Sequence, residues 1–136
     1  MKRLCAILLS LAIVSAACKK DDNNPSTPTV TTKTDTFTGT VPVNGSGIHN
    51  FTVENSGQVS VTLTTTGPSS TVPMGIGVGT PGDNACGLIA GASVTAVAGS
   101  SAQLTGVVSP GTLCVKIFDV GNQTAAVTYT VTVAHP

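Results

Sequence analysis

Two cysteines, Cys86 and Cys114, are the residues of this chain best suited to chemistry, and they lie 28 positions apart. A pair of thiols can bind a metal, attack a substrate or form a disulfide. Metal binding and thiol catalysis favour a Cys-x-x-Cys spacing or a nearby histidine, and the sequence offers neither here. Because the leader described below directs the chain into an oxidising compartment, we expect a structural disulfide between Cys86 and Cys114.

Acid–base and nucleophilic catalysis find little support in the sequence. The chain has only two histidines, His49 and His135, and it lacks the Gly-x-Ser-x-Gly elbow of serine hydrolases. Ser93 follows Gly91 but has no second glycine after it. We therefore expect both histidines to be hydrogen-bonded or exposed, and we expect no enzymatic activity.

A formal match to the dinucleotide-binding pattern Gly-x-Gly-x-x-Gly occurs at residues 77–82, which read GVGTPG. That pattern functions at the N-terminus of a helix, where the pyrophosphate binds. Pro81-Gly82 predicts a turn instead of a helix. We interpret the segment as a glycine-rich strand end, and we expect no cofactor.

Two predicted loops offer oxygen ligands for calcium. Asp83 precedes Asn84 in one loop, and Asp119 precedes Gly121 and Asn122 in the other. Carboxylate and amide oxygens are the ligands that calcium prefers. The same residues form turns without a metal. A calcium site at Asp83 and Asp119 is thus an alternative to a role in the turns alone.

Charge is sparse in the part of the chain that we expect to fold. The whole sequence has six basic and six acidic residues, and from residue 36 onward only Glu54, Asp83, Lys116 and Asp119 are charged. The folded part therefore carries a net charge of −2, with no basic patch for nucleic acid or for an anionic membrane surface. We expect no nucleic-acid partner.

The N-terminus predicts a signal peptide over residues 1–17. Lys2 and Arg3 precede an apolar run over residues 4–14, which is shorter than the roughly 20 residues of a transmembrane helix. The small residues before Cys18 resemble the lipobox of bacterial lipoproteins, in which this cysteine becomes the lipidated N-terminus. Ser15 stands where that pattern usually has leucine, so cleavage after Ala17 without lipidation is the alternative.

Residues 18–35 predict a tether that carries the lipid at Cys18. The stretch is polar, contains Pro25 and Pro28, and has no apolar period, as is typical of a disordered segment. A flexible tether of this length spans about 20–25 Å. The basic residues and acids after Cys18 resemble the surface-export signals of some Gram-negative groups. We expect a location in the cell envelope, on the outer membrane or the cell surface, with the lipid as the membrane contact.

From residue 36 to residue 136 the pattern predicts one all-β domain. Val59, Val61 and Leu63 alternate with polar residues, and residues 127–133 alternate in the same way, as in half-buried strands. Strands at intervals of 8–12 residues indicate an antiparallel β-sandwich of about eight to nine strands. The expected strands cover residues 37–41, 48–53, 59–63, 73–78, 93–97, 102–108, 113–119 and 127–133.

Several short segments, in their order and spacing, resemble the bacterial pre-peptidase C-terminal domain. They are FTGTV at 37–41, FTV at 51–53, VSVTL at 59–63, PGTLCVKI at 110–117 and YTVTV at 129–133. The resemblance extends over about residues 36–134. It implies a jelly-roll-like sandwich with an accessory, non-catalytic role in exported proteins.

Together these features predict a non-catalytic, lipid-anchored module that binds a protein or a glycan at the cell envelope. A carbohydrate-binding module and a structural subunit of an envelope complex are the alternatives. Glycan sites stack sugars on aromatic rings, yet the chain has no tryptophan, and Tyr129 lies on the apolar face of its predicted strand. Phe118 is out of phase with its apolar neighbours, so it is the ring that we expect to be exposed.

Overall fold

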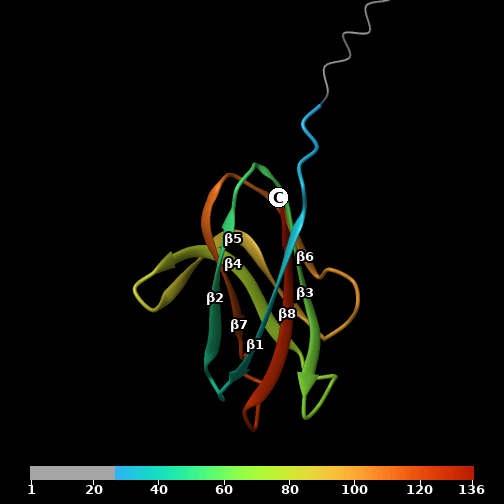
Figure 1. Cartoon of the computed structure of the whole chain (residues 1–136). Coiled ribbons are helices and arrows are strands. Elements are labelled where there is room, and N and C mark those ends of the chain that lie inside the picture. The colour runs from blue at the N-terminus through green and yellow to red at the C-terminus, as the bar shows by residue number, and fades with distance from the viewer. Residues whose placement is uncertain (1–26) are drawn as a thin grey trace, which may run out of the picture.

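The computed structural model describes residues 27–136, whose regular structure consists of β-strands (Figure 1). The prediction of an all-β fold is confirmed, since these residues form eight strands and no helix. The strands are β1 (Lys33–Val41), β2 (Ser46–Val53), β3 (Gly57–Gly67), β4 (Met74–Gly82), β5 (Ala85–Ala96), β6 (Leu104–Val108), β7 (Gly111–Phe118) and β8 (Val127–His135).

The strands form two four-stranded sheets, and every pair of neighbours is antiparallel. Sheet A has the order β1-β8-β3-β6, and sheet B has the order β2-β7-β4-β5. Apart from the β4–β5 hairpin, consecutive strands alternate between the two sheets. This order is that of a jelly roll, so the expected sandwich is present with eight strands.

The core lies between the sheets and follows the alternation seen in the sequence. In β3, Val61 and Leu63 are fully buried, and in β8 Val131 and Val133 are fully buried as well. The intervening threonines face outward. Burying one face of each sheet against the other supplies the main favourable free energy of the fold.

β1 begins at Lys33, earlier than the sequence predicted. The expected strand began at Phe37 because Asp35 occupies a position that should be apolar. In the structure Asp35 points inward like Phe37, and its carboxylate accepts a hydrogen bond from His135 of β8. A charged residue in the apolar phase therefore hid the first residues of the strand.

β5 begins at Ala85, although the sequence predicted a strand only from Ser93. The segment from Ala85 to Ala92 has no polar alternation, because most of it is exposed on both sides. It pairs with β4 through a tight turn at Asp83 and Asn84, and Asn84 adopts a positive φ of 53°. The predicted turn is thus present, while the predicted irregular segment after it is a strand.

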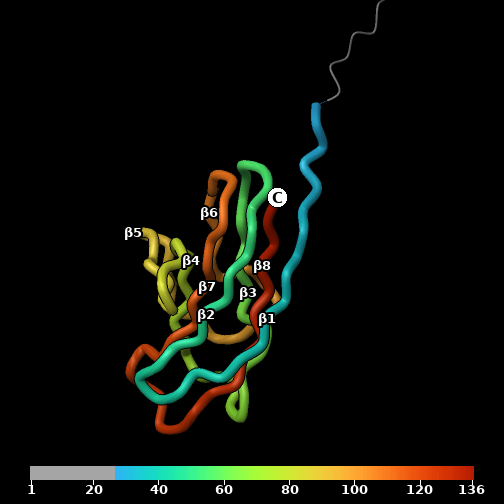
Figure 2. The backbone as a smooth tube through the Cα atoms, turned by 60° about the vertical axis from the view of Figure 1, so that its left-hand side comes forward, coloured from blue at the N-terminus to red at the C-terminus, as the bar shows by residue number. Residues whose placement is uncertain are grey.

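The N-terminal start of β1 and the C-terminal end of β8 lie side by side at one end of the sandwich (Figure 2). Lys33 is paired with His135 at this end, and Val41 is paired with Val127 at the other. The ladder between them is unbroken. The chain segment that precedes residue 33 therefore leaves the domain from this end.

Candidate binding groove beside the disulfide

Three glycines alternate along β4 and leave a bare stripe on the outer face of sheet B. Met74, Ile76 and Val78 point into the core, so Gly75, Gly77 and Gly79 point outward. Gly77 and Gly79 belong to the segment that formally matched the dinucleotide pattern. No helix follows them, and the interpretation as a glycine-rich strand is confirmed.

Each of these glycines has a neighbour packed where a side chain would otherwise be. A Cβ at Gly75 would lie 2.2 Å from the Phe118 ring, and one at Gly77 would lie 2.6 Å from the Leu88 side chain. A Cβ at Gly79 would lie 2.2 Å from the backbone oxygen of Gly87. The glycine stripe therefore lets the tip of the β4–β5 hairpin lie directly against the outer face of sheet B.

A long irregularity in β5 changes the direction of the hairpin beside the sheet. Gly77 pairs with Ser93, but Gly79 pairs with Leu88, so residues 89–92 of β5 stand opposite the single residue Val78. Gly91, within this bulge, has a φ of 78°, which favours glycine. Such bulges bend and twist a strand. Figure 1 shows the hairpin projecting from the side of the sandwich.

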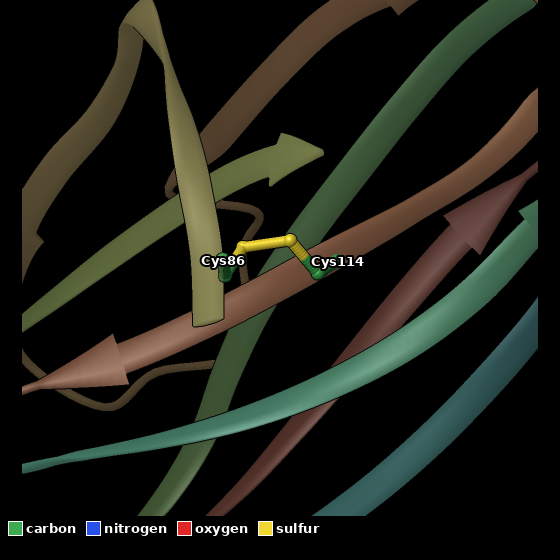
Figure 3. Close-up of a disulfide and its surroundings, with 2 residues drawn as sticks. All are labelled: Cys86 and Cys114. Carbon is green, nitrogen blue, oxygen red and sulfur yellow. A yellow bond between two sulfur atoms is a disulfide. The ribbon is translucent and has the colours of Figure 1, made fainter. Parts of the chain in front are cut away.

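The disulfide fixes the hairpin tip in this position. Cys86 near the start of β5 is bonded to Cys114 of β7, with a Cα–Cα distance of 5.9 Å (Figure 3). Cys114 faces outward between Leu113 and Val115, yet it is fully buried because the hairpin tip covers it. The predicted pairing is present. The sequence analysis was wrong only in placing Cys86 in an irregular segment.

A groove lies between the hairpin tip and the outer face of β2. Its volume is about 380 Å³, and it is lined by Ile48, Asn50, Gly82, Asn84 and Ala85. Asn50 is paired with Cys114 in the β2–β7 ladder, so one wall of the groove stands directly beside the disulfide. The lining has two carboxamides, the aliphatic side chains of Ile48 and Ala85, and no charged group.

Lys116 and Phe118 lie on the outer face of sheet B but do not line the groove. The Lys116 ammonium stands 5.8 Å from the centroid of the Phe118 ring, within the range of a cation–π contact. From the sequence we expected the Phe118 ring to be exposed. It is half-buried, because its ring packs against the backbone of Gly75.

The carboxylate of Asp119 is engaged by the backbone around it. Its Oδ1 accepts hydrogen bonds from the amides of Gly121, Asn122 and Gln123, and its Oδ2 accepts one from Asn44. These bonds lower the pKa of Asp119 below its ordinary value, with the bond from Asn44 as the largest cause. The carboxylate therefore organises two neighbouring loops.

Asp83, the other candidate calcium ligand, lies on a different loop at the turn between β4 and β5. Within residues 27–136, no group of three or more histidine, cysteine or acidic side chains is arranged to hold a metal. The structure does not bring Asp83 and Asp119 together in such a group. Both residues act as turn residues in this fold.

The two histidines are hydrogen-bonded inside the sandwich. His49 Nε2 lies 2.8 Å from the hydroxyl of Tyr129, and the His49 ring stacks on Phe37 at a centroid distance of 4.8 Å. Burial lowers the pKa of His49 and raises the pKa of Tyr129. This pair spans the two sheets and contributes to the core.

His135 is 1% exposed and shares a hydrogen bond of 3.0 Å with Asp35. The hydrogen bond with His135 is the main cause that lowers the pKa of Asp35. A hollow of about 340 Å³ lies beside His135, with Lys33 and Glu54 in its lining. Nε2 of His135 is hydrogen-bonded to Asp35, whereas the buried Nδ1 has no hydrogen-bond partner among the described residues.

The chain matches none of the protein-family models and none of the curated proteins with which it was compared. The predicted signal peptide, the lipidation site Cys18 and the first half of the tether lie outside the described residues 27–136. Among the described residues, no helix is long and apolar enough to cross a membrane.

Proposed function

We propose that this protein is a non-catalytic binding module of the bacterial cell envelope, anchored through a lipid on Cys18, which holds a neutral polar ligand in the groove beside the disulfide. The groove is the observation that carries the proposal. Its wall is a hairpin held by a covalent bond and by backbone packing at Gly79. A wall that is fixed in advance lowers the entropic cost of binding.

The lining indicates the chemistry of the ligand. Asn50 and Asn84 can each donate and accept hydrogen bonds, while Ile48 offers a small apolar contact. A charged ligand would find no counter-charge among the lining residues. A ligand rich in hydroxyl groups meets both needs, and we propose a segment of a glycan. The groove has no aromatic ring, so the binding would rest on hydrogen bonds more than on stacking.

Binding of the purified protein to a panel of surface and envelope glycans tests this proposal. Asn50→Ala should abolish binding of any glycan that the protein captures, because it removes a carboxamide from the wall. Asn84→Asp should weaken binding while keeping a residue that tolerates the positive φ at that turn. Asn55→Ala is the matched control, since Asn55 is exposed in the turn between β2 and β3.

Two results would refute the groove as a glycan site. The first is a glycan that binds equally well to the protein and to the Asn50→Ala variant. The second is a panel without any glycan that binds, in which case the ligand belongs to another class.

The anchor is a separate part of the proposal and has its own test. Mass spectrometry of the mature protein should find a diacylated or triacylated Cys18 at the N-terminus. An unmodified N-terminus at Cys18 would mean release into the envelope without an anchor. The likeness to pre-peptidase C-terminal domains also remains a proposal, supported by the jelly-roll order of the strands.

A structural role in an envelope complex is the second candidate function. It is favoured by one observation on the side of the sandwich that β5 and β6 form. Neither strand has a charged residue, and Leu88, Ile89 and Val107 are exposed there.

A further inference from the structure

β6 is an edge strand whose outer side has no partner in the described chain. It pairs only with β3 and stands last in sheet A. The loop before it fills the neighbouring part of the β3 edge, where the Gln103 carboxamide bonds the backbone of Leu63 at 2.8 and 3.1 Å. The free edge is therefore confined to the five residues Leu104–Val108.

This edge lacks the charges that usually guard an exposed strand. The chain has no charged residue between Asp83 and Lys116, a stretch that includes all of β5 and β6. By contrast β1, at the opposite edge of sheet A, begins with Lys33 and Asp35. Natural edge strands avoid pairing with other chains by carrying lysines or inward-pointing charges, or by being short. β6 is short but carries no charge.

The side chains of β6 add an apolar surface to this free backbone. Val107 is 83% exposed, more than any other large aliphatic side chain in residues 27–136. Beside the strand, a slot of about 30 Å³ opens between the two sheets. Leu104 and Val108 of β6 line it together with Ala92 of β5. A partner on this edge would cover both Val107 and the slot.

The sequence of β6, Leu-Thr-Gly-Val-Val, is complementary to itself when two copies run antiparallel. With the two-fold axis at Gly106, Leu104 of one copy lies opposite Val108 of the second copy, on the inner face beside the slot. On the outer face, Thr105 lies opposite Val107, a pair of β-branched residues that suits a strand. Gly106 lines the slot between the sheets, and a Cβ there would meet nothing within 4 Å, so the slot has room for a side chain at this position.

We propose that β6 is a homodimer interface, in which it pairs with β6 of a second copy to make a continuous eight-stranded sheet from two copies of sheet A. The neutral edge fits a copy of itself because no like charges meet across the two-fold axis. This inference is independent of the glycan groove, which lies on sheet B. It requires only the folded domain.

Sedimentation equilibrium of the purified protein tests the dimer over a range of concentrations. We expect a monomer–dimer equilibrium that Val107→Lys shifts to monomer, with the dissociation constant raised at least about tenfold. Thr38→Lys is the matched control, because it places the same charge on the same face of sheet A but on β1. A parent protein that stays monomeric at all concentrations, or equal effects of the two lysines, would overturn the proposal.

Cross-linking tests the register without relying on a destabilising variant. Residues opposite one another in antiparallel strands have Cα atoms about 4.5–5.5 Å apart, within the range of a disulfide. Gly106→Cys should therefore give a covalent dimer on oxidation. Val107→Cys should cross-link at least about tenfold more slowly, since its diagonal neighbour in the second copy stands roughly 7–8 Å away. Equal cross-linking of both variants would show that the pairing has another register or is random.

Discussion

Removal of the disulfide should destabilise the domain and release the tip of the β4–β5 hairpin. The change is the double substitution Cys86→Ala and Cys114→Ala. In the chain-entropy model, a bond between residues 28 positions apart contributes about 3.5 kcal/mol to the free energy of unfolding. Cys114 is fully buried and Cys86 is 7% exposed, so the loss of two packed sulfur atoms adds to this value.

A fall of this size corresponds to about 14 °C in melting temperature, at roughly 4 °C per kcal/mol for a domain of about this length. Circular dichroism on heating measures the shift, and urea unfolding measures the free energy. The control is the same pair of measurements on parent protein that has been reduced. The reduced parent should lose the contribution of the covalent link alone, and the double variant should be less stable still, because it also lacks the two packed sulfur atoms.

The position of the hairpin provides a second readout. Its tip is held over β7 by the disulfide and by the contact of Gly79 with the backbone of Gly87. Without the bond, limited proteolysis should cut near Asp83 and Asn84 sooner than elsewhere. A double variant that melts within about 4 °C of the parent would show that the bond does not stabilise the fold in the way we infer.

Three further predictions concern single residues. Gly79→Ala should lower the free energy of unfolding by about 1–3 kcal/mol, because its Cβ would overlap backbone atoms of Gly87. Gly87→Ala is the control: its Cβ would lie no closer than 3.6 Å to another atom, so its free energy of urea unfolding should stay within about 1 kcal/mol of the parent. The hydrogen bond to His135 lowers the pKa of Asp35 below its ordinary value of 3.8. The stability that the ionised carboxylate contributes to the fold is therefore fully present above pH 3.8, and it is lost as the pH falls through the lowered pKa of Asp35 in the folded protein. Asp35→Asn should therefore be less stable than the parent at pH 6 and similar to it near pH 2, and equal differences at both values would contradict this. Asp119→Ala should lower the melting temperature at neutral pH, since four backbone amides lose their acceptor. Calcium should leave the melting temperature of the parent unchanged. A rise with calcium that Asp119→Ala abolishes would support a metal site instead.

Local pattern was enough to predict most of the sandwich. Alternation is strict in β8 and in β3 as far as Leu63, where each strand has one face in the core and one in solvent; a bulge between Leu63 and Thr65 then shifts the phase of β3. It failed at Asp35, where a buried hydrogen bond replaces an apolar contact. It failed again in the first half of β5, because that segment is held by the contact of Leu88 with Gly77 of β4 and by the disulfide to β7.

The candidate site was only partly predictable for the same reason. The redox argument was sufficient to pair Cys86 with Cys114. The groove depends on the hairpin folding back over sheet B, which brings Asn84 near Asn50 of β2. The alternating glycines of β4 were the available signal, since glycine at successive outward positions of a strand indicates close approach by another backbone. We interpreted Gly77 and Gly79 as part of a glycine-rich strand end, without inferring that another segment packs against them.

The ladder between β1 and β8 also determines how the domain would respond to force. The segment that precedes Lys33 enters β1 directly, and β1 is paired with β8 from Lys33 to Val41. A pull on that segment along the direction of β1 loads all these pairs in shear at the same time. They must break together, because no end of the ladder can open first. Resistance to such a pull depends on the rate of unfolding. The mechanical strength of the domain under such a pull would therefore depend on this one ladder.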